Sequence, residues 1–155
     1  MTVMECQMVD STVYQFEELV SLPVTIPQNF TLNPRLIPGK DYLATVFQLE
    51  RQATSQECLA FLRQLGAILV GESGLALVLK LRGDSLPDKK FIASFDEEEK
   101  LPHFCDGSHR VPCACHLKDH WERVELGFEP CKYDHWPLGH FGYICLLAFL
   151  EKNEA

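Results

Sequence analysis

Apolar residues follow two different periods between residues 41 and 100, and these periods predict the central elements of the fold. Residues 42–49 are rich in β-branched and aromatic side chains, which is typical of a strand. Residues 54–65 instead place apolar side chains three and four positions apart, which predicts an amphipathic helix. A capping box at Thr54 marks its start, and Gly66 suits the left-handed conformation that ends a helix. The apolar face of this helix consists of Cys58, Phe61, Leu62 and Leu65.

After this helix the apolar pattern changes to a period of two. Residues 67–70 form a short apolar run, which predicts a buried strand. Residues 75–82 carry leucine at every second position, so one face of a strand would point into the core. Residues 91–95 alternate in the same way. The predicted order over 41–100 is therefore strand, helix, strand, strand, strand.

The two ends of the chain add further elements. Residues 12–20 combine a capping box with apolar residues at roughly helical spacing, so we expect a short helix there. Residues 21–39 contain four prolines, each of which fixes φ and removes a backbone donor. This segment should run extended over the surface, with one edge strand near 24–26. Residues 141–151 include a continuous apolar run, which fits a C-terminal strand.

These elements predict one α+β domain over residues 1–155. At 46% hydrophobic residues, a chain of this length can bury a sizeable core without disulfides. We expect a mainly antiparallel sheet with one or two helices packed on one face, and an irregular Cys/His-rich segment near the C-terminus. The domain divides into an N-terminal helix and Pro-rich extended segment (1–40), a core (41–100), the Cys/His-rich segment (101–140) and the C-terminal strand (141–151).

Charge and cysteine content narrow the class of protein. The net charge is −8 and no dense basic stripe is present, which argues against direct nucleic-acid binding. The N-terminus lacks the features of a secretory signal, and the longest apolar run is about half of a membrane span. An odd count of seven cysteines then predicts reduced thiols in a cytoplasmic protein. We interpret the acidic run 96–99 as a solvated turn or the first turn of a helix, with mimicry of a phosphate backbone as the alternative.

All six histidines and four of the cysteines lie between residues 103 and 140. Thiolate and imidazole are the ligands that zinc and iron–sulfur clusters prefer. Four of these donors lie within eleven residues of one another, so little loop-closure entropy opposes their convergence on one ion. The predicted metal ligands are Cys105, His109, Cys113 and Cys115. The rival set is His116, His120, Cys131 and His135.

Residues 105–109 read Cys-Asp-Gly-Ser-His, which resembles the signature pentapeptide of the CDGSH iron–sulfur proteins. In that family the cysteine and histidine bind a 2Fe–2S cluster, so the resemblance assigns this role to Cys105 and His109. The family pattern also has two upstream cysteines that flank a single residue, and this chain has no cysteine between Cys58 and Cys105. Zinc is therefore the first cofactor that we expect, and a 2Fe–2S cluster the second.

Two other interpretations of the same segment stay open. In one, no metal binds, because buried thiols pack as small hydrophobes and histidines as rings with polar edges. In the other, Cys113 or Cys131 acts as a nucleophile activated by His116 or His135.

Aromatic residues crowd the same part of the chain and point to a function. Trp and Tyr are the residues that most often anchor protein interfaces. We therefore expect a non-enzymatic cytoplasmic protein that binds another protein through residues 103–140, with neither nucleic acid nor membrane as a partner. The alternative is a small metal- or thiol-dependent enzyme that uses the same Cys/His cluster. The aromatic residues are Trp121, Phe128, Tyr133, Trp136, Phe141 and Tyr143.

Overall fold

The computed structural model describes residues 16–49, 55–97, 100–101, 110–117, 120–127 and 144–152. These residues form a six-stranded mixed sheet with two α-helices and a short 3-10 helix. Neighbouring strands are antiparallel except β3 and β6, which are parallel. The predicted α+β class and mainly antiparallel sheet are confirmed. The strands, in sheet order, are β1 (Phe16–Thr25), β2 (Asp41–Leu49), β6 (Ile144–Glu151), β3 (Phe91–Ala93), β4 (Arg110–Leu117) and β5 (His120–Gly127).

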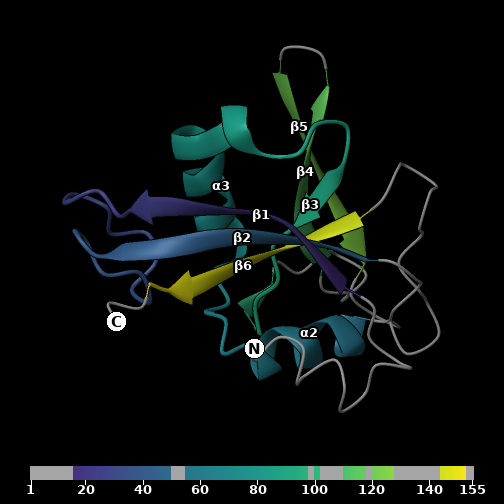
Figure 1. The fold of residues 1–155 in the computed structure, drawn as a ribbon, viewed down its shortest axis with the longest axis horizontal. Helices are drawn as coiled ribbons and strands as arrows, with labels where there is room; N and C mark the ends of the chain where they lie inside the picture. The colour runs from purple at the N-terminus through teal and green to yellow at the C-terminus, as the bar shows by residue number, and fades with distance from the viewer. Residues whose placement is uncertain are drawn as a thin grey trace.

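The sheet is strongly twisted. In Figure 1, β1, β2 and β6 run together across the molecule, whereas β4 and β5 run steeply across that direction. The two halves meet where β3 pairs with β6 on one side and with β4 on the other. The helices are α2 (Ser55–Gln64), α3 (Gly71–Arg82) and the 3-10 helix η1 (Gly83–Ser85).

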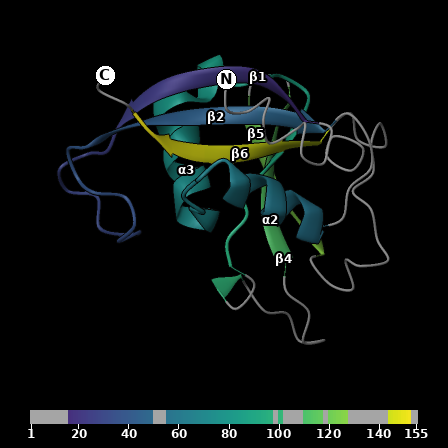
Figure 2. The ribbon, with the colours of Figure 1, turned by 60° about the horizontal axis from the view of Figure 1, so that its bottom comes forward.

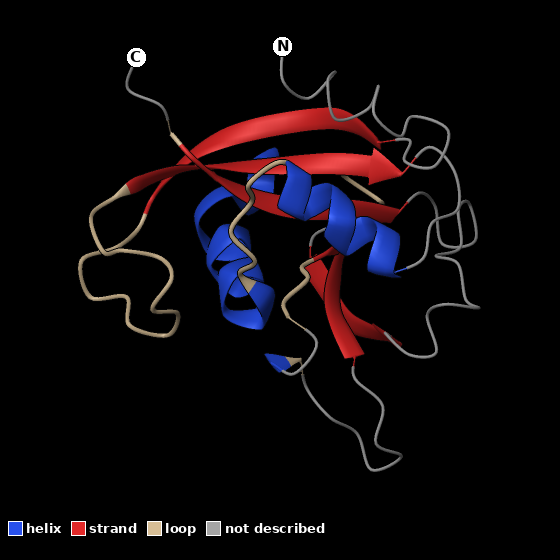
Figure 3. Cartoon of the chain, turned by 90° about the horizontal axis from the view of Figure 1, so that it is seen from below, coloured by secondary structure: helices blue, strands red, loops and turns tan. Residues whose placement is uncertain are grey.

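The two helices pack against opposite faces of the sheet. In β2, Phe47 and Leu49 join the core cluster of α2, whereas Ala44 and Val46 join the cluster of α3. In Figure 2, α3 passes behind β1, β2 and β6, whereas α2 lies below β6 on the near side of the strands, and Figure 3 likewise shows α2 in front of the strands and part of α3 behind them. The twist turns one face toward each helix. One helix therefore covers each face of the sheet.

Helix α2 lies where the pattern predicted it. Its face is buried at Phe61 and Leu62, and Gly66 ends the helix with a φ of 73°. The Phe61 ring stacks on Phe16 with centroids 4.0 Å apart and meets the edge of Phe47 at 5.1 Å. Aromatic packing of this kind fixes the helix on the sheet. Thr54, the proposed capping residue, lies outside the described residues.

Residues 75–82 are helical rather than a strand, so this prediction was wrong. Helix α3 exposes Glu72, Ala76 and Lys80, which are four apart, and this is a helical period. The alternating leucines gave the wrong prediction because Leu77 is also buried. It widens the apolar face of the helix, so that the apolar positions resemble the period of two that is typical of a strand. Leucine, alanine and lysine all favour helix over strand.

The predicted N-terminal helix was also wrong where the structure describes it. Residues 16–20 begin β1, which pairs along its length with β2, and residues 12–15 lie outside the described part. The register of this pair shifts between Glu18 and Val20. Because a bulge inserts one extra residue, it interrupts the strand period and produces apolar spacing that resembles a helix. The expected edge strand near 24–26 is the end of β1.

The remaining strand predictions have mixed outcomes. Strands β2, β3 and β6 lie where apolar runs predicted them. Residues 67–70 make only an isolated bridge, between Ile68 and Phe149. Part of the segment 101–140, expected to be irregular, forms the hairpin of β4 and β5. Within the described residues, no helix is long and apolar enough to cross a membrane.

Candidate functional site

Two of the four predicted metal ligands, Cys113 and Cys115, lie on β4. Alternation along the strand points both thiols to the α2 face, where both residues are buried. The Cys113 Sγ donates a weak hydrogen bond to the Val111 carbonyl oxygen at 3.6 Å. Cys105 and His109 lie outside the described residues. Within the described part of the chain, no three metal-binding side chains gather.

Two of the described thiols, those of Cys115 and Cys145, have raised pKa values, which make them poor nucleophiles. Burial raises the pKa of Cys115, and the nearby negative charges of Asp88 and Glu122 add to this effect. Burial also raises the pKa of Cys145 to about 12, with a smaller opposing effect from Lys90. A nucleophilic cysteine needs the opposite shift, because the thiolate is the reactive form.

The strand geometry also separates the side chains that were proposed to act together, either as a nucleophile and its base or as ligands of one metal ion. Cys113 and His116 lie three positions apart on β4, so their side chains point to opposite faces. The pairing of His116 with Trp121 and of Leu117 with His120 places the two histidines of the rival metal set on opposite faces too. His120 Nε2 instead lies 2.7 Å from Glu122 Oε2. Neither a Cys113–His116 dyad nor one ion shared by His116 and His120 fits this hairpin.

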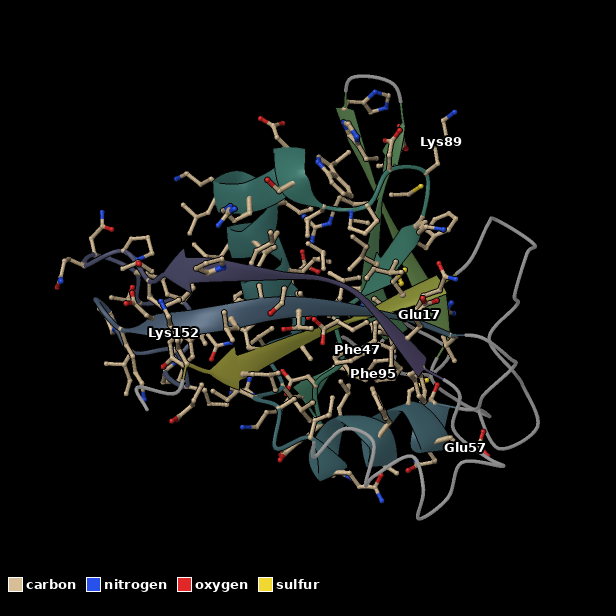
Figure 4. All side chains as sticks on the ribbon, viewed as in Figure 1. Glu17, Phe47, Glu57, Lys89, Phe95 and Lys152 are labelled. Carbon is tan, nitrogen blue, oxygen red and sulfur yellow. The ribbon has the colours of Figure 1, made fainter. Side chains whose placement is uncertain are left out.

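His116 belongs to a different constellation, on the α3 face. Its Nδ1 lies 2.8 Å from Asp88 Oδ1, and its ring lies against Trp121 with centroids 4.9 Å apart. The Lys89 amide donates to the His116 carbonyl oxygen at 3.1 Å, with Lys89 at a φ of 61°. In Figure 4 the Lys89 side chain points away from the body of the protein beside the hairpin. The 88–89 turn is thus fixed to β4 by both backbone and side chain.

A cavity of about 370 Å³ lies beside this pair, between the hairpin and the end of α3. We call it the His116 cavity. Its lining is mostly polar and includes Lys80, Arg82, Asp84, Ser85, His116 and Trp121.

A second surface feature is the loop between β1 and β2. It is anchored at its base, where Ile26 donates to the Lys40 carbonyl at 3.0 Å and Gly39 donates to the Ile26 carbonyl at 2.7 Å. Leu36 is buried in the α3 cluster, and the Ile37 amide donates to the Tyr42 hydroxyl at 3.0 Å. The loop therefore has a defined shape.

A buried polar network ties the same loop to the start of α3. Asn33 Nδ2 donates to the Val70 carbonyl at 3.0 Å, and Arg35 donates to both carboxylate oxygens of Asp96 at 2.8 and 3.0 Å. The hydrogen bond to Asp96 raises the pKa of Arg35. Asp96 was expected in a solvated acidic turn, but it is buried, because Arg35 neutralises it.

This anchored loop exposes apolar side chains. Leu32 is 75% exposed and Ile37 52% exposed, although both are large and hydrophobic. Leu32 also lines a groove of about 590 Å³ between the loop and the first turns of α3, and Ile37 lies five residues further along the same loop. We call Leu32, Ile37 and this groove the loop surface. Its lining includes Leu32, Pro34, Arg35, Val70, Ala76 and Lys100.

Sequence reasoning missed both the His116 cavity and the loop surface. The Asn33-Pro34 pair is a local turn signal that could have marked the loop as structured. The pairs Arg35–Asp96 and Asp88–His116 join positions 61 and 28 residues apart, and no local pattern predicts them.

Comparison with known proteins gives no relative from which a role could be carried over. No protein-family model matches the chain, and neither a curated protein nor a solved structure matches it.

Proposed function

We propose that this chain is a non-enzymatic cytoplasmic protein that binds another protein, and that the loop surface is where it does so. The observation that carries the proposal is the exposure of Leu32 and Ile37 on a loop held by buried hydrogen bonds. Exposed apolar clusters beside a groove are typical of interaction sites. A rigid loop also loses little conformational entropy on binding, which favours affinity.

The groove favours an uncharged apolar side chain of the partner. Three of its four charged lining residues are already paired within the chain, because Arg35 pairs with Asp96 and Glu72 pairs with Arg123. A charged partner residue would have to compete with these pairs. An aliphatic or aromatic anchor would instead bury apolar surface against the loop and α3.

In this proposal the segment 103–140, expected from the sequence to be the binding surface, has a structural role instead. Cys113 and Cys115 face one side of β4, which is what a shared ion on Cys105, His109, Cys113 and Cys115 requires. Zinc is the ion that we propose, because cysteine and histidine are its usual ligands in structural sites, and its binding energy would stabilise the fold of the segment. Elemental analysis of the purified protein tests this part: about one zinc per chain supports it, and the absence of both zinc and iron contradicts it.

An enzyme that uses the Cys/His cluster has less support. The Cys113 thiol is buried and points away from His116, so it cannot be activated by that imidazole. The raised pKa values of Cys115 and Cys145 disfavour nucleophilic chemistry at these positions too.

The binding proposal is tested by selecting displayed random peptides on the full chain, with counter-selection on the double variant Leu32→Ser, Ile37→Ser. We expect enriched peptides with one large apolar residue in common, and at least about tenfold weaker binding to the double variant. Leu81→Ser is the matched control, because Leu81 is also an exposed leucine, 38% exposed, but lies at the far end of α3. Peptides that bind the double variant as well as the native chain would overturn the proposal.

A further inference from the structure

The His116 cavity lies away from the loop surface and carries its own chemistry. We infer that it binds a neutral, polyhydroxylated small molecule of about monosaccharide size. Three features lead to this inference: a ring nitrogen with a fixed orientation, an aromatic wall, and charged groups of both signs around the cavity.

The ring nitrogen is the Nε2 atom of His116. Because a carboxylate can only accept, the Nδ1 atom 2.8 Å from Asp88 carries a proton. Asp88 is not part of the cavity lining whereas His116 is, so the part of the ring not held by Asp88 borders the cavity. A ligand hydroxyl suits Nε2 in either form of the ring, since a hydroxyl can donate to the neutral imidazole and accept from the protonated one.

The wall is the indole of Trp121, which lines the cavity and lies against the His116 ring. Gly83 makes room for it, since a Cβ at that position would lie 3.1 Å from Trp121 Nε1. The apolar C–H face of a sugar ring packs well on an aromatic ring, and its hydroxyl groups then reach the polar side chains around it.

Charged groups of both signs surround the cavity. Lys80, Arg82 and Asp84 line it, and Asp88 lies just outside the lining, where it binds His116. A charged ligand would therefore meet groups of its own sign. A ligand whose hydroxyl groups both donate and accept can bind lysine, carboxylate, imidazole and the Ser85 hydroxyl alike.

The size and rigidity of the site fit the same inference. A volume of about 370 Å³ is at the small end of the range for small-molecule sites. The turn that carries Asp88 keeps Lys89 at a φ of 61°, which a residue with a side chain rarely adopts. Such a conformation persists only where its surroundings hold it, here through the bond from the Lys89 amide to the His116 carbonyl.

The test is a titration of the full chain with glucose, galactose, mannose, N-acetylglucosamine and inositol, followed by NMR of the Trp121 indole N–H. Comparison with Trp121→Phe assigns the resonance. We expect at least one of these probes to shift it, with a dissociation constant on the order of 1 mM. Citrate and spermidine, as charged probes of similar size, should bind at least about tenfold more weakly.

Two variants and one control complete the experiment. His116→Gln removes the imidazole, and Lys80→Met changes only an exposed rim residue, so it should fold even if the first variant does not. Each should weaken the responding sugar about threefold or more. The loop variant Leu32→Ser, Ile37→Ser should leave the titration unchanged. The inference is overturned if no neutral probe shifts the resonance, if a charged probe binds as well, or if Lys80→Met has no effect.

Discussion

At the scale of single residues, side chains distant in sequence control the two candidate sites. Asp88 orients His116, and Asp96 holds Arg35 against the start of α3. Each pair fixes a loop to the sheet or to a helix, so its effect reaches beyond its own contact. Such pairs fix the local geometry but add little to the free energy of unfolding. The cost of removing the two polar groups from water offsets much of the attraction between them.

Lys89→Gly should stabilise the protein. Lys89 has a φ of 61°, which costs a residue with a Cβ but not glycine. We expect a gain of about 0.5–1 kcal/mol, net of the added entropy of the unfolded chain. Urea unfolding measures it. Lys90→Gly is the control, because Lys90 has no positive φ, and this change should not stabilise. Equal losses in both variants would contradict the argument.

Arg35→Ala should destabilise by about 1–3 kcal/mol, because it leaves the buried Asp96 carboxylate without its partner. The double variant with Asp96→Ala should lose less than the sum of the two single changes. A double-mutant cycle from urea unfolding gives the coupling free energy. Additive losses would show that the two side chains are not coupled.

The buried thiol of Cys145 should make stability fall at alkaline pH. Its pKa is raised from 9.0 to about 12 in the folded protein. Above about pH 9 the unfolded chain therefore loses this proton while the folded chain keeps it, so the free energy of unfolding decreases as pH rises. The contribution approaches about 1.4 kcal/mol per pH unit between these two values. Urea unfolding from pH 8 to 10.5 should show a smaller slope for Cys145→Ala.

At the scale of elements, the sequence predicted what local pattern determines. The α2 helix has a clear apolar face and is followed by Gly66, β2 is rich in β-branched and aromatic residues, and β6 is apolar up to its last residue. The N-terminal helix failed because a bulge broke the strand period, and the strand at 75–82 failed because α3 has a wide apolar face. In both cases the sequence fits a helix and a strand about equally well, and contacts with the rest of the fold determine which of the two forms.

Gly74→Ala should destabilise α3, although alanine is the better helix former. A Cβ at position 74 would collide with the Val70 side chain, which is buried between the helix and the sheet. We expect a loss of about 1–3 kcal/mol from overpacking, where propensity alone predicts a gain of about 1 kcal/mol. Thermal or urea unfolding distinguishes the two signs. Ser73→Ala, at the neighbouring and less buried position, is the control and should be close to neutral.

At the scale of the whole molecule, the candidate sites depend on how distant segments meet. The sequence indicated the Cys/His-rich segment because donors that are close in the chain form a visible pattern. The loop surface needs the β1–β2 loop to meet α3, and the His116 cavity needs α3 to meet the hairpin. Which of these elements lie side by side follows from the order of strands in the sheet, and the local spacing of apolar residues does not determine that order.

The state of the cysteines tests the molecule as a whole. Four of the seven cysteines lie in the described part outside any disulfide, and all four are buried: Cys58, Cys113, Cys115 and Cys145. In the native protein these four should resist a water-soluble thiol reagent, because a reagent reaches them only when the core opens. After denaturation with a chelator, which releases any bound metal, most of the seven should react. Rapid reaction of all of them in the native state would contradict the packing of β4 and β6. Three disulfides in the denatured protein would instead contradict the reduced, cytoplasmic character that we propose.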